Sequence, residues 1–207
     1  HYLVPAVCST LVTSVYLLVD TLIIGQGVGA LGISALNIFM PFFLLFNGIG
    51  LLFGIGSGIL ISSEDGMGNK KKANQYFATG FVSILSIAII LGLIWNYYLQ
   101  PLCVILGANS DTIDLVLEYG KCIMAFAPVF MMSNYFAPIV RNMKNPKLVM
   151  CAVLTGSVLN VILDYVFVFP MDMGMFGAAA ATVIGSLTTL LVLSTHFIKK
   201  QNRVKIN

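Results

Sequence analysis

Apolar residues gather into six long stretches along the chain, and short polar segments separate them. The stretches cover residues 3–24, 33–62, 77–99, 115–140, 148–169 and 175–198. Because a helix rises 1.5 Å per residue, each stretch is long enough to cross a hydrocarbon core about 30 Å thick. No separator is long enough to form a soluble domain. The pattern therefore predicts an all-α integral membrane protein, with six transmembrane helices in one unit over residues 1–207.

The composition indicates the same class of protein. Of the 207 residues, 58% are hydrophobic and 9% are charged, whereas an ordinary soluble domain carries roughly 25% charged residues. A disordered chain is excluded because disorder requires low hydrophobicity and high charge. A membrane β-barrel is disfavoured because its apolar residues alternate weakly instead of forming long runs. The net charge of +3 is too small to suggest a nucleic-acid partner.

The basic residues lie on one side of the six predicted spans. Ten of the eleven Lys and Arg residues fall in the second-to-third separator, the fourth-to-fifth separator and the C-terminal tail, namely Lys70, Lys71, Lys72, Arg141, Lys144, Lys147, Lys199, Lys200, Arg203 and Lys205. The opposite loops contain Asp111, Asp114 and Asp172. Cytoplasmic loops carry an excess of basic residues, so we expect both termini to face the cytoplasm.

Ionisable side chains inside the spans are few, and in lipid they mark candidate ion sites. Asp20 lies in the first span and Asp164 in the fifth, with Tyr16 and Asn160 respectively one helical turn earlier on the same face. Thr182 lies in the sixth span. Counted from the outer ends of their spans, the two Asp residues and Thr182 are about 7, 9 and 10 Å deep. We therefore expect these five residues to form one ion-binding site.

Two carboxylates at one depth in a medium of low dielectric constant cannot both ionise easily. The pair can bind and release a proton, or hold Na⁺ together with the Asn and Thr oxygens, which is the chemistry of an ion-coupled carrier. The alternative is that each Asp lies close enough to a helix end to reach headgroup water. No resident cofactor is expected, and the four cysteines lack the spacing of a metal site or disulfide framework.

Proline, glycine and asparagine residues add detail to the predicted bundle. Pro41 and Pro128 lie inside the second and fourth spans, where proline frees backbone carbonyls and kinks helices. The second span also carries small residues at four-residue spacing, which predict close helix packing. These are Gly50, Gly54 and Gly58. In the same span, Asn47 is expected to hydrogen-bond to another helix.

Several motifs resemble those of one transporter family. The motifs are Val19-Asp20-Thr21, the pair Ala35 and Pro41, and the segments 160–164 (NVILD) and 174–182 (GMFGAAAAT). In this order they are similar to the first, second, fifth and sixth helices of the MATE family. These are the multidrug and toxic compound extrusion transporters. Gly66-Met-Gly-Asn resembles the family's loop between helices 2 and 3. The resemblance extends over essentially the whole chain and is nearest to the bacterial DinF and MepA branch.

The resemblance implies a secondary active antiporter of the bacterial plasma membrane that exchanges H⁺ or Na⁺ for organic, mostly cationic, drugs. It matches Asp20 and Tyr16 to helix 1 of the family's cation site, Asn160 and Asp164 to helix 5, and Thr182 to helix 6. The partners implied are drug molecules, the lipid bilayer and a second lobe of six helices. The chain is expected to be an excerpt of a twelve-helix protein, and the alternative is a half-size protein that pairs.

The family also carries an Asn on helix 4 in this network. Asn134 is the nearest candidate here, but its register and depth differ, so it is not assigned to the site.

Three other functions remain as alternatives. A related lipid-linked oligosaccharide flippase would carry cationic residues inside its cavity, whereas only Lys121 lies near the outer end of a span. An intramembrane enzyme would need His ligands or a nucleophile beside a base, and His1 and His196 lie at opposite ends of the chain. No enzymatic activity is therefore expected. A non-transporting membrane scaffold would show no gradient-dependent transport in vesicles.

Overall fold

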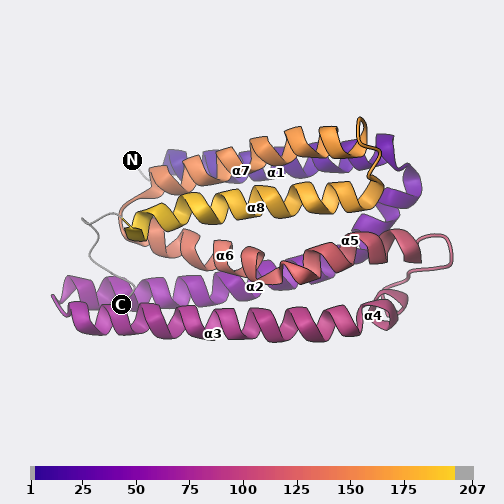
Figure 1. Ribbon diagram of the computed structural model, residues 1–207. Helices are drawn as coiled ribbons and strands as arrows, with labels where there is room; N and C mark the ends of the chain where they lie inside the picture. The colour runs from indigo at the N-terminus through magenta and orange to yellow at the C-terminus, as the bar shows by residue number, and fades with distance from the viewer. Residues whose placement is uncertain (1–2, 199–207) are drawn as a thin grey trace.

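The computed structural model describes the backbone of residues 3–198 and the side chains of Val7 and of residues 11–197. Within these residues the chain forms eight helices and no strand (Figure 1). The helices are α1 (Leu3–Gly27), α2 (Ala30–Gly66), α3 (Lys70–Tyr97), α4 (Leu99–Ile105), α5 (Ile113–Ala125), α6 (Ala127–Asn142), α7 (Pro146–Val168) and α8 (Gly174–Ile198). The tail cations Lys199, Lys200, Arg203 and Lys205 lie outside the described residues, as does His1.

Most of the long helices are apolar enough to cross a membrane. Among the described residues, α2, α3, α7 and α8 each meet this condition alone, and α5 and α6 meet it together as one bent span. In α1, the residues with described side chains form a shorter apolar helix, Leu11–Gly27. The sequence-based prediction of an all-helical membrane protein is therefore confirmed, with four to five candidate spans in the described residues.

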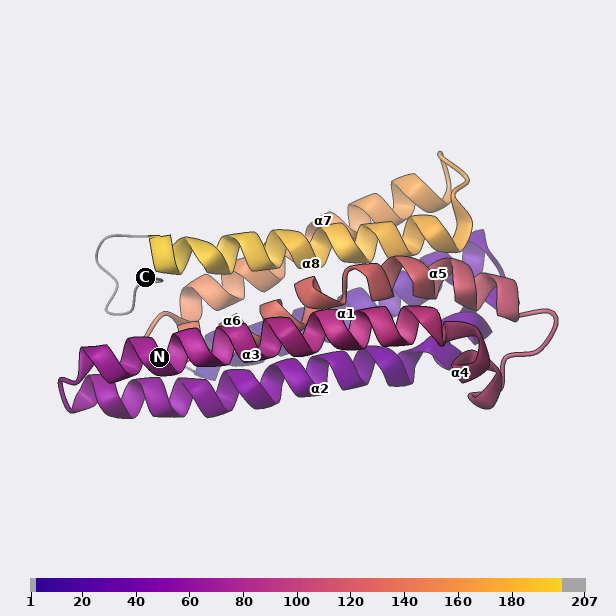
Figure 2. The same cartoon turned by 60° about the horizontal axis from the view of Figure 1, so that its bottom comes forward.

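The helices run alternately up and down along one long axis. In Figures 1 and 2, α1, α3 and α7 run one way, and α2, the α5–α6 pair and α8 run the other way. The start of α3, with Lys70–Lys72, lies at the same end of the bundle as the end of α6, with Arg141, and the turn before α7, with Lys144. We call this the basic end. The loops that hold Asp111 and Asp172 lie at the opposite, acidic end.

Small residues allow two helix pairs to pack with their backbones close together. A Cβ atom added to Gly54 of α2 would lie 2.7 Å from the carbonyl oxygens of Asn134 and Tyr135 in α6. In the same way, a Cβ atom on Gly156 of α7 would lie 2.6 Å from the carbonyl oxygen of Gly185 in α8. The close packing predicted from the glycine spacing of the second span is confirmed.

The fourth predicted span is broken. Residues 115–140 were expected to form one helix, but the chain bends by 56° between α5 and α6, at Phe126. Pro128 has no N–H group, so the Met124 carbonyl cannot accept the hydrogen bond of a continuous helix, and it accepts instead from a backbone N–H at the break. Gly92 of α3 lies against this carbonyl, because a Cβ atom there would be 3.0 Å from Met124 O. Pro41, in contrast, lies within an unbroken α2.

Candidate functional site

Two buried carboxyl groups lie where α1 packs against α7. Asp20 of α1 is 5% exposed and Asp164 of α7 is fully buried, and their charges act directly on one another. Among the described residues, Asp20 Oδ1 and both carboxyl oxygens of Asp164 have no hydrogen-bond partner. An ionised carboxylate without hydrogen bonds is costly away from water. The pair therefore requires a proton or a cation to balance it.

Asn160 and Thr182 link the carboxyl pair to α8. Asn160 lies one turn before Asp164 on α7, and its Nδ2 donates a hydrogen bond of 3.4 Å to Thr182 Oγ1. The Thr182 hydroxyl donates in turn to the Ala178 carbonyl at 3.0 Å. Asn160 Oδ1 is buried without a partner among the described residues. An amide oxygen and a hydroxyl oxygen thus stand beside the two carboxyl groups, a donor set that suits a hard cation.

Two tyrosines complete the surroundings of the carboxyl groups. Tyr16 lies one turn before Asp20 on α1, and its hydroxyl is close enough for the charges of Asp20 and Asp164 to act on it. Tyr119 of α5 is buried, interacts with the Thr182 hydroxyl and feels the charges of both Asp residues. A small cavity of about 20 Å³ is lined by both tyrosines together with Asp20 and Thr182.

The structure thus brings together all five residues that the sequence singled out. It adds Tyr119, which sequence reasoning missed. A signal for it existed, because Tyr119 lies six residues into α5, about 9 Å from the helix start, at a depth similar to that of Thr182 in α8. The alternative that the Asp residues reach headgroup water is disfavoured by their burial.

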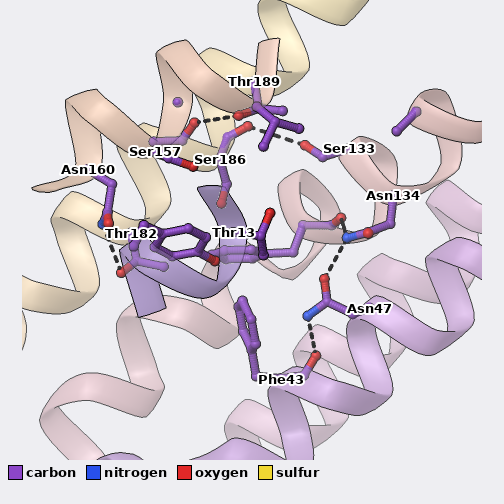
Figure 3. Close-up of a pocket in the computed structure, with 16 residues that line it drawn as sticks. Thr13, Phe43, Asn47, Ser133, Asn134, Ser157, Asn160, Thr182, Ser186 and Thr189 are labelled. Atoms are coloured by element: carbon purple, nitrogen blue, oxygen red, sulfur yellow. Dashed lines mark hydrogen bonds between the residues drawn. The ribbon is translucent and has the colours of Figure 1, made fainter. Parts of the chain in front are cut away.

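A larger cavity of about 170 Å³ lies beside the carboxyl pair, among α1, α2, α6, α7 and α8 (Figure 3). Tyr16, Asn160 and Thr182 belong to its wall and connect it with the surroundings of the carboxyl pair. The remaining polar lining carries no formal charge and comprises Thr13, Asn47, Ser133, Asn134, Ser157, Ser186 and Thr189. Apolar side chains such as Phe43 and Phe130 complete the lining, so the cavity combines apolar with uncharged polar groups and has no charged side chain among its lining residues.

Asn134 lies on this cavity wall and not at the carboxyl pair. Its Nδ2 donates to Asn47 Oδ1 of α2 at 2.6 Å. The hydrogen bond between helices that the sequence predicted for Asn47 is thereby confirmed. Asn134 is a cavity residue, which agrees with its exclusion from the ion site on register and depth.

Comparison with known proteins gives the family. The MatE family model matches residues 5–166, well over half of the chain. The chain belongs to the MatE family. The relatives reported next are export proteins by name, in agreement with the expectation that the chain has no enzymatic activity.

Curated relatives of this MatE chain are multidrug export proteins. Multidrug export protein MepA of Staphylococcus aureus (strain MSSA476) is 31% identical over 213 residues, covering 100% of this chain and 46% of that protein. Its counterpart in Staphylococcus saprophyticus is 30% identical with the same coverage. The chain spans about half the length of the curated relatives that it matches.

Solved MATE structures share the fold. A MATE crystal structure in the bent conformation superimposes with a TM-score of 0.90 at 24% identity, over 98% of this chain and 45% of that one. An inward-facing multidrug resistance MATE transporter of the MOP superfamily gives a TM-score of 0.87 at 25% identity, over 93% and 44%. The helix arrangement of the MatE chain is thus that of one half of these transporters.

Proposed function

We propose that this chain is one six-span lobe of a secondary active multidrug exporter of the bacterial plasma membrane. In this proposal Asp20 and Asp164, with Tyr16, Asn160 and Thr182, take up H⁺ or Na⁺ in exchange for an organic, mostly cationic, drug. The observation that carries the proposal is the pair of buried carboxyl groups whose oxygens lack partners among the described residues. They adjoin an uncharged cavity whose lining includes the other three residues of the proposed ion site, Tyr16, Asn160 and Thr182.

The length of the helices supports six spans. The backbone of α1 is helical over 25 residues, or about 37 Å, which exceeds the hydrocarbon core. The bent α5–α6 pair acts as the fourth span in this arrangement. With the basic end of the bundle in the cytoplasm, an even number of spans brings both ends of the chain to the cytoplasmic side.

The lengths of the relatives support a second lobe. Since the matched export proteins are about twice as long as this chain, we propose that another six-helix lobe completes the drug pathway. The same relatives support efflux over a scaffold function.

The uncharged cavity supports drug efflux over lipid-linked oligosaccharide flipping. A pyrophosphate requires cationic side chains, and no Lys or Arg is among the residues that line the larger cavity. Lys121, the exception noted in the sequence, is exposed on α5 and does not line either cavity described above.

The test uses the full transporter that carries this lobe, reconstituted into vesicles with a fluorescent organic cation. A proton gradient and a sodium gradient are imposed separately, so that the arm that drives efflux identifies the coupling ion. Asp20→Asn and Asp164→Asn should each reduce gradient-driven efflux to background. Asp172→Asn is the matched control, because Asp172 is exposed in the turn before α8. Near wild-type efflux by both variants would overturn the proposal.

A further inference from the structure

Two asparagine side chains form a rigid pair on the wall of the larger cavity. The Nδ2 group of Asn134 donates to Asn47 Oδ1 at 2.6 Å and to the Phe130 carbonyl at 2.9 Å, which occupies both of its hydrogens. Asn47 Nδ2 donates one hydrogen to the Phe43 carbonyl at 2.7 Å. Each amide is thus fixed by its own helix and by the other amide.

This bonding leaves one donor and one acceptor available. An amide has two N–H donors and one carbonyl oxygen, so the second hydrogen of Asn47 Nδ2 and the oxygen of Asn134 have no partner among the described residues. Both residues line the cavity. Because the two amides are joined directly, this donor and this acceptor are held at a fixed spacing.

Two of the hydroxyl groups that line the cavity do not offer the same fixed pattern. Ser133 Oγ donates to the carbonyls of Val129 and Ser186, and Thr189 Oγ1 to those of Ala152 and Gly185. Their hydrogens are therefore engaged with backbone. The amide pair, in contrast, presents a donor and an acceptor together, which matches a group that also carries both.

The position of the pair separates it from the ion site. Figure 3 shows Asn47 and Asn134 across the cavity from Asn160 and Thr182, which adjoin the carboxyl groups. No charged side chain lines the wall around the pair. A ligand could therefore direct its cationic group towards Asp20 and Asp164 and a neutral group towards the asparagines.

We infer that the Asn47–Asn134 pair is a specificity site for transported compounds that bear a neutral carboxamide or lactam. Such a group carries an N–H donor beside a carbonyl acceptor and pairs with the two free positions of the asparagines. The inference rests on the proposed export function and adds to it the chemical class of the group that is recognised. A site built to hydrogen-bond a substrate discriminates strongly against an analogue that lacks the matching atoms.

The experiment compares two fluorescent cations of equal charge and similar size in vesicles containing the full transporter. One carries a primary carboxamide, and the other carries an isopropyl group in its place and so lacks both the N–H donor and the carbonyl acceptor. Wild-type protein should export the carboxamide cation faster. Asn47→Leu, which keeps a side chain branched at Cγ but removes the amide, should reduce carboxamide export about tenfold and leave export of the isopropyl cation unchanged.

Controls separate a loss of selectivity from a loss of folding. Asn134→Leu is a second variant with the same expected result, and Asn96→Leu, an exposed position on α3, is the matched control that should change neither rate. Equal reduction of both rates in the two cavity variants, or equal export of both cations by wild type, would overturn the inference. Absence of gradient-driven export of either cation by wild type would instead overturn the proposed function, and the inference with it.

Discussion

Gly54 of α2 is the position where a single methyl group should disturb the bundle most directly. A Cβ atom there would lie 2.7 Å from two carbonyl oxygens of α6, those of Asn134 and Tyr135. Backbone atoms cannot rotate away as the end of a flexible side chain can. Gly54→Ala should therefore push α6 away from α2. Gly56→Ala, two residues along, is the matched control because a Cβ atom there meets nothing within 4 Å.

The size of the effect follows from these distances. Ordinary contact for a Cβ atom begins near 3.4 Å, so the two helices must separate by about 0.7 Å at Gly54. Overpacking of this kind costs about 1–3 kcal/mol. Both substitutions gain up to about 1 kcal/mol from the better helix propensity of alanine. Gly54→Ala should consequently be less stable than Gly56→Ala by about 1–3 kcal/mol.

The assay is thermal unfolding of both variants in the same detergent, followed by the loss of helical signal. The midpoint for Gly54→Ala should fall below that for Gly56→Ala. Separation of α2 from α6 also stretches the 2.6 Å bond between Asn134 and Asn47, so selectivity for a carboxamide should decrease in Gly54→Ala alone. Equal unfolding midpoints would refute the argument that backbone contact sets the spacing of these helices.

Two further substitutions test the ion site and a turn. Tyr119→Phe keeps the ring contact with Phe39, whose ring centroid is 5.4 Å away, but removes the hydroxyl beside Thr182. The coupling-ion concentration that gives half-maximal efflux should therefore rise about fivefold. An unchanged concentration would exclude a role for this hydroxyl. Lys144 has a φ of 66°, a backbone conformation that glycine adopts more easily than lysine, so Lys144→Gly should stabilise the protein by about 1 kcal/mol. Lys147 lies inside α7, so Lys147→Gly should destabilise the protein by about the same amount. Unfolding midpoints in one detergent distinguish the two, and a lower midpoint for Lys144→Gly would contradict the prediction.

The sequence predicted two kinds of feature: helices marked by long apolar runs, and candidate site residues of a type that is rare within the spans. Long apolar runs can satisfy their backbone in lipid only as helices, so the class of fold follows directly. Asp20 and Asp164 were conspicuous because few charges lie within the spans. Their depths along separate helices predicted that they lie near Thr182, and in the structure Asp20 and Thr182 line one small cavity while Asn160, one turn from Asp164, bonds to Thr182. Such comparisons work because a helix has a fixed rise per residue.

Features that depend on which residues of other helices a side chain contacts were harder to predict. Pro128 indicated a kink, yet Pro41 lies in an unbroken helix, so proline alone does not determine where a span breaks. Tyr119 is one of many aromatic residues in an apolar chain, and only the packing of α5 against α8 brings it to Thr182. The pairing of Asn134 with Asn47 likewise depends on which helices meet.

The break between α5 and α6 has a consequence for how the protein is made. With 13 and 16 residues, neither half reaches the roughly 20 residues needed to cross the membrane, so the two must leave the translocon as one unit. The irregular backbone at the break, next to Met124, is tolerated in lipid only where protein covers it. Gly92 of α3 supplies that cover, and α3 is synthesised before α5. Because of this order along the chain, α3 is already present to cover the break when the α5–α6 segment emerges from the ribosome.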